Sequence, residues 1–151
     1  MPAKGTTDNP IYTRGMVIGD GYEEVEHTAD WSLRIRGKTM SGLLESGARG
    51  MLALMGVSPG LPLQARREIV INADDRECLL VAWLNEVLFE LEIHQTVPVE
   101  MDLEAGEDWL RASVVEAPCP PPQKPIKAAT FHGLEVADTP KGLEAVLVFD
   151  V

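Results

Sequence analysis

The sequence lacks an apolar run long enough to cross a membrane, and its N-terminus lacks the basic and then apolar pattern of a signal peptide. Cysteine is scarce too, with Cys78 and Cys119 as the two in the chain. They form no C-x-x-C pair, which argues against a thiolate metal site. A single disulfide is the alternative to reduced thiols. We expect reduced thiols, a cytoplasmic location and no membrane contact.

Positive charge is also in short supply. The chain has 13 Lys and Arg against 24 Asp and Glu, which gives a formal net charge of −11. Arg66 and Arg67 are its only two adjacent basic residues, whereas nucleic-acid-binding domains usually present a basic face to the phosphates. Strong direct binding of RNA or DNA is therefore disfavoured. A cation or a basic protein partner suits the charge better.

Nucleotide-binding motifs are absent, since neither G-x-G-x-x-G nor G-x-x-x-x-G-K-[ST] occurs. The serines have no context that indicates a catalytic nucleophile. An enzyme is therefore unsupported by the motifs.

The length of 151 residues suits one domain with a proper core. Residues 1–21 show no sustained hydrophobic period, and we expect them to form a flexible tail. Residues 22–151 are expected to form a single domain.

Two segments have the periodicity of amphipathic helices. The first has Thr39 as a candidate N-cap and ends at Gly56. The second begins at Asp74 and Glu77, which have capping-box spacing, and continues to Leu91. Its other face is expected to be solvated and carries Asn85, Glu86, Glu90 and Glu92.

Alternation of apolar and polar residues predicts strands, with Pro98 marking an edge strand. The expected strands are residues 31–37, 68–72, 97–103, 109–116, 126–136 and 143–151. Two main helices among about six strands indicate an α+β fold. We expect a two-layer sandwich with a mixed or antiparallel sheet.

The stretch Glu26-His27-Thr28-Ala29-Asp30 stands at the start of the first of these strands, and the chain ends on Asp150 and Val151. Asp150 alternates with Phe149 and can point outward, beside the terminal carboxylate of Val151. Two adjacent anions favour a hard divalent cation, which takes oxygen ligands. With Asp30 beside them the site would have three carboxylates. The alternative is that both aspartates merely lie at strand ends on the surface.

Two further possibilities concern histidine and lysine. Imidazole suits zinc, so His27, His94 and His132 could join Asp30, although no H-x-x-x-H pattern supports this. Lys127 is the only cation in the apolar segment 126–136. It either faces water, contacts an anionic group of a partner, or balances the nearby carboxylates.

The sequence as a whole resembles the archease family. The matching stretches arrive in the family's order and cover essentially everything after Tyr22. They are Glu26-His27-Thr28-Ala29-Asp30, Gly37-Lys38-Thr39, Leu79-Leu80-Val81-Ala82-Trp83-Leu84-Asn85-Glu86, residues 126–136, and Phe149-Asp150-Val151.

This resemblance implies an accessory protein of the RtcB-type RNA ligase, which joins RNA ends in tRNA splicing and RNA repair. Archeases promote guanylylation of that ligase and its multiple turnover, and are activators rather than enzymes. The resemblance implies metal ligands at Asp30, Asp150 and Val151, most often for calcium, with magnesium or manganese as alternatives. It implies a functional, partner-facing role for Lys127, and we expect the same role for His27 and His132.

One residue departs from the family pattern: Ala82 stands where many relatives have an aspartate before the tryptophan. The partner could therefore dock differently. Two other functions remain open, a freestanding metal-dependent phosphoester hydrolase and a chaperone-like binding module with a structural cation.

Overall fold

The computed structural model describes residues 11–13, 16–25 and 31–151. Over these residues the chain forms two helices and ten strands, and every strand pairing is antiparallel. The larger sheet has the order β1-β2-β3-β4-β10-β8, with β9 also paired to β10. Its strands are β1 (Ile11–Thr13), β2 (Met16–Gly19), β3 (Tyr22–Glu24), β4 (Trp31–Gly37), β8 (Ala128–Thr130), β9 (Ala137–Thr139) and β10 (Gly142–Asp150).

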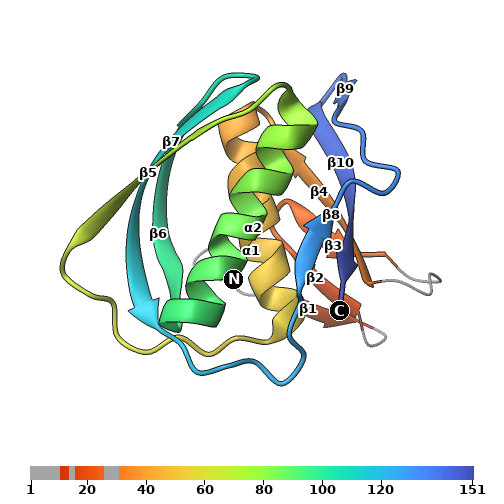
Figure 1. The fold of residues 1–151 in the computed structure, drawn as a ribbon. Helices are drawn as coiled ribbons and strands as arrows, with labels where there is room; N and C mark the ends of the chain where they lie inside the picture. Colours follow the sequence, from red (N-terminus) through yellow and green to blue (C-terminus); the bar gives the residue numbers. More distant parts are fainter. Residues whose placement is uncertain (1–10, 14–15, 26–30) are drawn as a thin grey trace, which may run out of the picture.

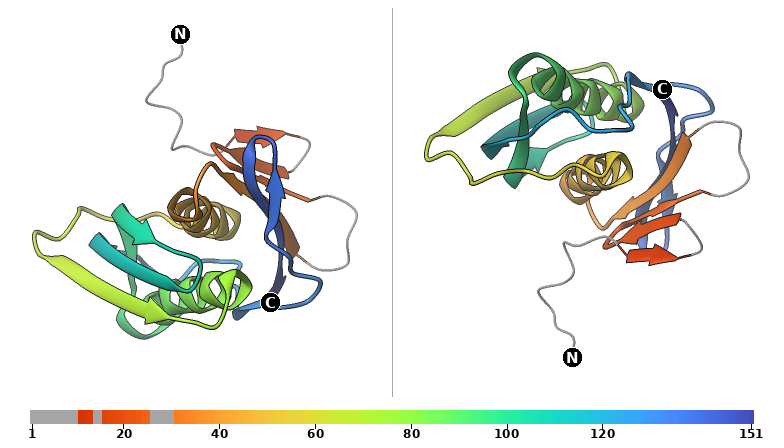
Figure 2. Two further views of the ribbon diagram at one scale, coloured as in Figure 1. Left: turned by 90° about the horizontal axis from the view of Figure 1, so that it is seen from above. Right: turned by 90° about the horizontal axis from the view of Figure 1, so that it is seen from below.

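The smaller sheet has the order β5-β7-β6. Its strands are β5 (Arg66–Asn72), β7 (Trp109–Pro118) and β6 (Thr96–Ala105). Helices α1 (Met40–Met55) and α2 (Arg76–His94) lie between the two sheets, and each helix contacts strands of both (Figure 1). Seen from above and below, the helices run side by side through this space (Figure 2). The α+β class with two main helices is confirmed, but the strands divide between two sheets.

Helix α1 has the ends that the sequence predicts. The Thr39 side chain caps its start by accepting a 3.1 Å hydrogen bond from the backbone N–H of Gly42. Gly56 ends it in the left-handed region at φ 66°, where a residue without a Cβ is favoured. Leu43 and Leu44 on its inward face are completely buried.

Helix α2 begins one residue later than predicted. Its N-cap is Asp75, not Asp74, because the Asp75 carboxylate accepts a 2.8 Å hydrogen bond from the N–H of Cys78. Trp83 lies in the middle of α2 and is completely buried. Its indole N–H donates to the Leu44 carbonyl at 2.9 Å, which joins the two helices through a polar contact inside the core.

The predicted tail of residues 1–21 is wrong for its second half. β1 and β2 lie there and pair with each other, and β2 joins β3 through the two-residue turn Asp20-Gly21. Gly21 adopts φ 84°, which glycine accepts readily, and Asp-Gly between apolar residues is a hairpin signal. Val17 is 5% exposed, so this hairpin belongs to the core.

The predicted continuous strand over residues 126–136 is also wrong. Only β8 is a strand there, because the chain turns after Phe131, and the N–H of Leu134 donates back to the Phe131 carbonyl at 3.0 Å. Gly133 permits this turn at φ 60°. The prediction of an edge strand at Pro98 is confirmed, since β6 lies at the margin of the smaller sheet.

Both cysteines are free thiols, and burial raises the pKa of Cys119. In the part of the chain that the structure describes, neither helix is both long enough and apolar enough to cross a bilayer.

Candidate functional site

The last strand carries its final residues outward from a rigid position. Within β10, Phe149 pairs with Trp31 of β4 on one side and with Ala129 of β8 on the other. Phe149 is 2% exposed, whereas Asp150 is exposed and Val151 is 57% exposed. The alternation predicted from the sequence is therefore confirmed. Asp150 and the chain terminus face solvent from a strand that is hydrogen-bonded on both edges.

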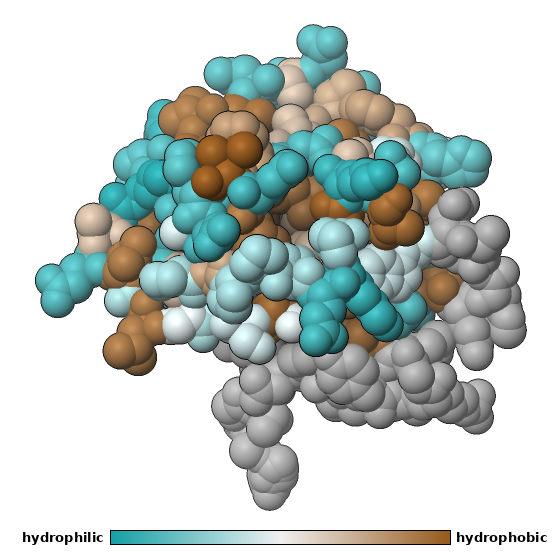
Figure 3. Space-filling model, turned by 60° about the horizontal axis from the view of Figure 1, so that its bottom comes forward, coloured by the Kyte–Doolittle hydropathy of each residue, from teal (hydrophilic) through white to brown (hydrophobic). Residues whose placement is uncertain are grey.

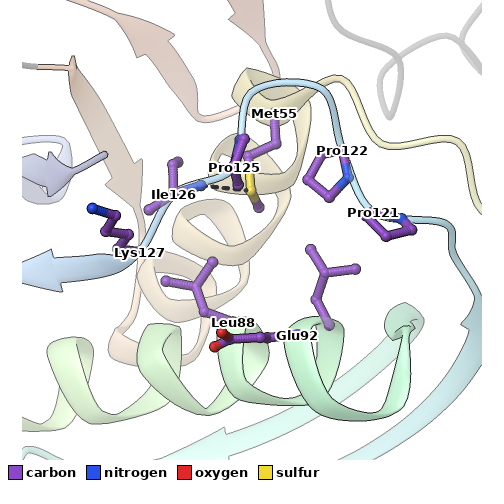
Figure 4. A pocket seen from close by; sticks show the side chains of 9 residues that line it. Met55, Leu88, Glu92, Pro121, Pro122, Pro125, Ile126 and Lys127 are labelled. Carbon is purple, nitrogen blue, oxygen red and sulfur yellow. Dashed lines mark hydrogen bonds between the residues drawn. The ribbon is translucent and has the colours of Figure 1, made fainter.

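Lys127 lies directly beside this terminus. Asp150 pairs with Ala128, and one residue further out the backbone N–H of Lys127 donates to the Asp150 carbonyl at 2.7 Å. The Lys127 side chain is exposed, and its ammonium group points away from Pro121 and Pro122 (Figure 4). The structure thus brings together Asp150, Val151 and Lys127.

Asp30 and His27 lie outside the described residues. The pairing between β4 and β10 is described as far as Trp31 opposite Phe149, and Asp30 precedes Trp31 in the sequence. The participation of Asp30 and His27 in the site therefore stays a prediction.

Glu24 is a residue near this end of the sheet that the sequence did not single out. One of its carboxylate oxygens accepts from the Trp31 indole N–H at 3.2 Å, and the other accepts from the N–H of Val17 at 3.0 Å. Both oxygens are thus occupied within the protein. Glu24 positions the Trp31 ring, and its place in an extended segment of the sequence gave no sign of this.

Asn85 has a positioning role as well. It was predicted to lie on a solvated face of α2, but its side chain binds the backbone of Ala129 twice. Its Oδ1 accepts from the Ala129 N–H at 2.9 Å, and its amide group donates to the Ala129 carbonyl at 3.4 Å. Because Ala129 pairs with Phe149, Asn85 fixes β8 against the end of β10.

His132 lies at the other end of β8 from Asp150. It is exposed and follows the strand, and its backbone N–H donates to the Thr130 hydroxyl at 3.3 Å. Thr130 pairs with Val148, two residues before Asp150, and the chain then continues away from the terminus. The structure does not bring His132 into contact with Asp150.

The segment after His132 is anchored to the start of α2. Arg76 donates to the Val136 carbonyl at 2.8 Å and to both carboxylate oxygens of Asp138 at 3.2 Å. The hydrogen bond from the Arg76 guanidinium lowers the pKa of Asp138 and raises that of Arg76. Glu77 accepts from the Val136 N–H at 2.8 Å, instead of closing a capping box.

His94, from the zinc alternative, has a structural environment. Its Nδ1 lies 2.9 Å from the Glu90 carboxylate, and its ring meets Phe89 edge-on with centroids 6.2 Å apart. Within residues 11–13, 16–25 and 31–151 no group of three His, Cys, Asp or Glu side chains is arranged to hold a metal.

The donors at the terminus suit a hard cation. The Asp150 carboxylate is exposed and Val151 beside it is exposed too, and carboxylate and backbone oxygens bind calcium, magnesium or manganese. Asp30 would supply a further carboxylate.

One serine has a sequence pattern seen in hydrolases. Ser58 stands in Gly56-Val57-Ser58-Pro59-Gly60, which fits G-x-S-x-G. In α/β-hydrolases that motif forms a sharp turn from a strand into a helix. Here the first glycine of the motif, Gly56, is the C-cap of α1 and Ser58 lies in the loop that follows, so the structural context of a nucleophile is not met.

Known proteins provide a match over most of the chain. Residues 22–151 match the model of the Archease protein family (MTH1598/TM1083). The chain is 31% identical over 142 residues to the protein archease of Methanosarcina mazei, covering 88% of this chain and 97% of that one. It is 28% identical to the protein archease of Archaeoglobus fulgidus, covering 86% and 98% of the two chains.

Two solved structures share the fold. One is described as an archease, possible chaperone, from Thermotoga maritima, with a TM-score of 0.64 and 22% identity over 84% of this chain and 94% of that one. The other is protein 1598 of Methanobacterium thermoautotrophicum, with a TM-score of 0.58 and 25% identity over 87% and 99% of the two chains. The chain therefore belongs to the archease family.

Proposed function

We propose that this chain is an accessory protein of an RtcB-type RNA ligase, acting in tRNA splicing and RNA repair, and not an enzyme with a substrate of its own. It promotes guanylylation of the ligase and its multiple turnover. A divalent cation, calcium first and magnesium or manganese as alternatives, is held by Asp30, Asp150 and Val151. The observation that carries this proposal is the exposed pair Asp150 and Val151 at the end of β10, whose last residues pair with β4 as far as Phe149 and with β8 as far as Asp150, in a member of the archease family.

The chain's own residues have distinct tasks in this proposal. Asp150 and Val151 present oxygen donors from a fixed backbone, because β4 and β8 hold β10 from both sides. Lys127, whose backbone binds the Asp150 carbonyl, faces the partner together with His27 and His132. When bound, the cation supplies positive charge to an otherwise acidic surface, which lets that surface approach the anionic phosphates of a nucleotide.

The partner is a protein and not a nucleic acid. The net charge of −11 opposes direct phosphate contact, and we place the protein in the cytoplasm with the ligase. An acidic surface steers basic surfaces toward it and speeds their association.

The test measures guanylylation of the RtcB-type ligase from the same source, with GTP and manganese, in the presence and absence of this protein. Wild type is expected to accelerate the reaction, and Asp30→Ala and Asp150→Asn are expected to lose that effect. Asp102→Asn, an exposed aspartate on β6, is the matched control. Equal rates with wild type and Asp30→Ala would remove the metal site from the mechanism.

A chaperone-like binding module with a structural cation is the second candidate, because the Thermotoga maritima relative is described as a possible chaperone. A calcium-dependent rise in melting temperature with no effect on the ligase would favour it. Turnover of a phosphoester by the purified protein alone would instead favour a metal-dependent hydrolase.

A further inference from the structure

A cavity of about 480 Å³ lies between the ends of the two helices and the proline-rich loop that precedes β8. Its walls are mainly apolar and include Met55 of α1, Leu88 and Leu91 of α2, and Pro121 and Pro122 of the loop. In Figure 4 the loop passes over one side of the cavity and α2 forms the other side. Its volume is in the range of pockets that bind small molecules or single large side chains.

The cavity is held open by backbone contacts of the loop. At one end of the loop the backbone N–H of Cys119 donates a 2.8 Å hydrogen bond to the Gln95 carbonyl. At the other end the backbone N–H of Ile126 donates to the Met55 sulfur at 3.4 Å. The next residue, Lys127, donates its backbone N–H to the Asp150 carbonyl of β10. Prolines restrict the backbone between these anchors. A partner would therefore meet a preformed cavity and lose little entropy in ordering it.

The charge at the cavity favours a cationic group. Glu92 is exposed and lies beside Leu88 at the cavity wall, whereas the Lys127 ammonium points away from the space (Figure 4). Glu92 is also within the last turn of α2, where the helix dipole places partial negative charge. An apolar group with a positive charge next to it complements both features.

Two exposed apolar side chains of α2 lie on a different side of the helix from its cavity-lining residues, because Phe89 and Ile93 follow Leu88 and Glu92 by one residue each, about 100° around the helix axis. Phe89 is 50% exposed and Ile93 is 56% exposed, and they are four residues apart, so they lie on the same side of the helix. The side of the molecule that carries the proline-rich loop comes forward in Figure 3, where hydrophobic residues reach the surface in several patches between hydrophilic ones. A small ligand would fill the cavity and leave this strip uncovered. A protein segment that passes around α2 would cover both.

We propose that this cavity, together with Phe89 and Ile93, is a docking site for a segment of the protein partner. That segment inserts one large apolar side chain into the cavity and places a neighbouring Lys or Arg on Glu92. The inference rests on the proposed function for the identity of the partner, which is the ligase. Lys127 connects the two surfaces, since it lines the cavity while its N–H binds the Asp150 carbonyl.

Two substitutions test the site by different means. Pro122→Trp places an indole at the half-buried rim of the cavity and fills it, and Glu92→Lys reverses the charge at an exposed position. Matched controls are Leu61→Trp at a residue 86% exposed and Glu68→Lys at an exposed residue on β5. The dissociation constant for the purified ligase is measured for each, together with guanylylation and the melting temperature of each variant.

Both test variants are expected to raise the dissociation constant about tenfold or more, as loss of an interface anchor does, while the controls remain within about twofold of wild type. Glu92→Lys keeps the test decisive if Pro122→Trp lowers the melting temperature. If wild type binds and activates the ligase and both variants match it, the docking site is wrong and the proposed function stands. If wild type neither binds nor activates the ligase, both proposals fall.

Discussion

The backbone N–H of Lys127 donates a 2.7 Å hydrogen bond to the carbonyl oxygen of Asp150. This bond extends the pairing of β8 with β10 by one residue beyond Ala128. It fixes the backbone of the last acidic side chain while leaving its carboxylate exposed. Two residues that stand apart in the sequence are thereby neighbours at one corner of the larger sheet.

Calcium is expected to stabilise the protein through this corner. If the cation binds the folded chain and not the unfolded one, a cation concentration of about 100 times the dissociation constant adds about 2.7 kcal/mol to the free energy of unfolding. For a chain of this length the melting temperature should rise by about 5 °C or more. Thermal unfolding in EDTA and in calcium measures the shift, and Asp150→Asn should abolish most of it.

Asp102→Asn is the control for that experiment, because it removes one carboxylate from an exposed position on the smaller sheet. It should show the same shift as wild type. An undiminished calcium shift in Asp150→Asn would contradict the assignment of the terminal strand as a ligand.

The helix ends show what local sequence can predict. Thr39 and Gly56 were predicted as caps of α1 and are its caps, since a hydroxyl before the helix and a glycine after it act within a few residues. The pairing of β4 with β10 depends on residues more than 100 positions apart, such as Trp31 and Phe149. Alternation predicts each of these strands but not which strands become neighbours. The division into two sheets could not be predicted for that reason.

The predicted acidic face of α2 shows the same limit at the level of side chains. Periodicity placed Glu90 with solvated residues, yet it is 7% exposed. The smaller sheet contributes Arg67 from β5 and Glu116 from β7, and the Arg67 guanidinium lies 3.5 Å from Glu86, 3.5 Å from Glu90 and 3.2 Å from Glu116. A sequence pattern within one helix cannot predict that a sheet formed elsewhere in the chain covers that face of the helix.

Removal of Arg67 is therefore expected to be costly. Arg67→Met leaves three carboxylates together, two of them almost buried, and removes the guanidinium that all three share. Loss of a charged hydrogen-bonding partner at such a site lowers the free energy of unfolding by about 2 kcal/mol or more. Urea unfolding measures this loss.

The control for Arg67 is its neighbour. Arg66→Met removes the same charge from a side chain that is 46% exposed, and should change the free energy by less than about 1 kcal/mol. Adding Glu90→Gln to Arg67→Met should restore part of the loss, because it removes one of the crowded charges. Equal stability of the two single variants would contradict a central role for Arg67.

The N-cap of α2 should make stability depend on pH. The hydrogen bond from the Cys78 backbone N–H lowers the pKa of Asp75 in the folded protein. Its contribution is therefore complete above the unfolded-state pKa of about 4 and is lost as the pH falls through the lower folded value. Asparagine caps helices without titrating. The melting temperature of wild type should therefore decrease more than that of Asp75→Asn when the pH is lowered from about 5 to about 2.

Asp74→Asn serves as the matched variant for this pH series, because Asp74 precedes the cap. The difference in melting temperature between Asp74→Asn and wild type should stay constant over the same pH range. Asp75→Ala should melt below Asp74→Ala at pH 7, where the cap is ionised. The reverse order would place the cap at Asp74 after all.

Two glycines with positive φ should differ in their tolerance of alanine. Gly142 opens β10 at φ 124°, and a Cβ there would lie 2.6 Å from the Gly37 carbonyl oxygen and 2.9 Å from the Lys38 Cα. Gly56 has φ 66° and no atom within 4 Å of such a Cβ. Gly56→Ala should therefore cost about 1 kcal/mol of unfolding free energy, from backbone strain alone. Gly142→Ala adds a clash with backbone atoms and should cost about 3 kcal/mol.

Because Gly142 lies at the far end of β10 from Asp150, the calcium-induced rise in melting temperature should persist in Gly142→Ala at temperatures where the variant is folded. Equal costs for the two substitutions would show that β4 and β10 separate at this end more easily than their close approach indicates.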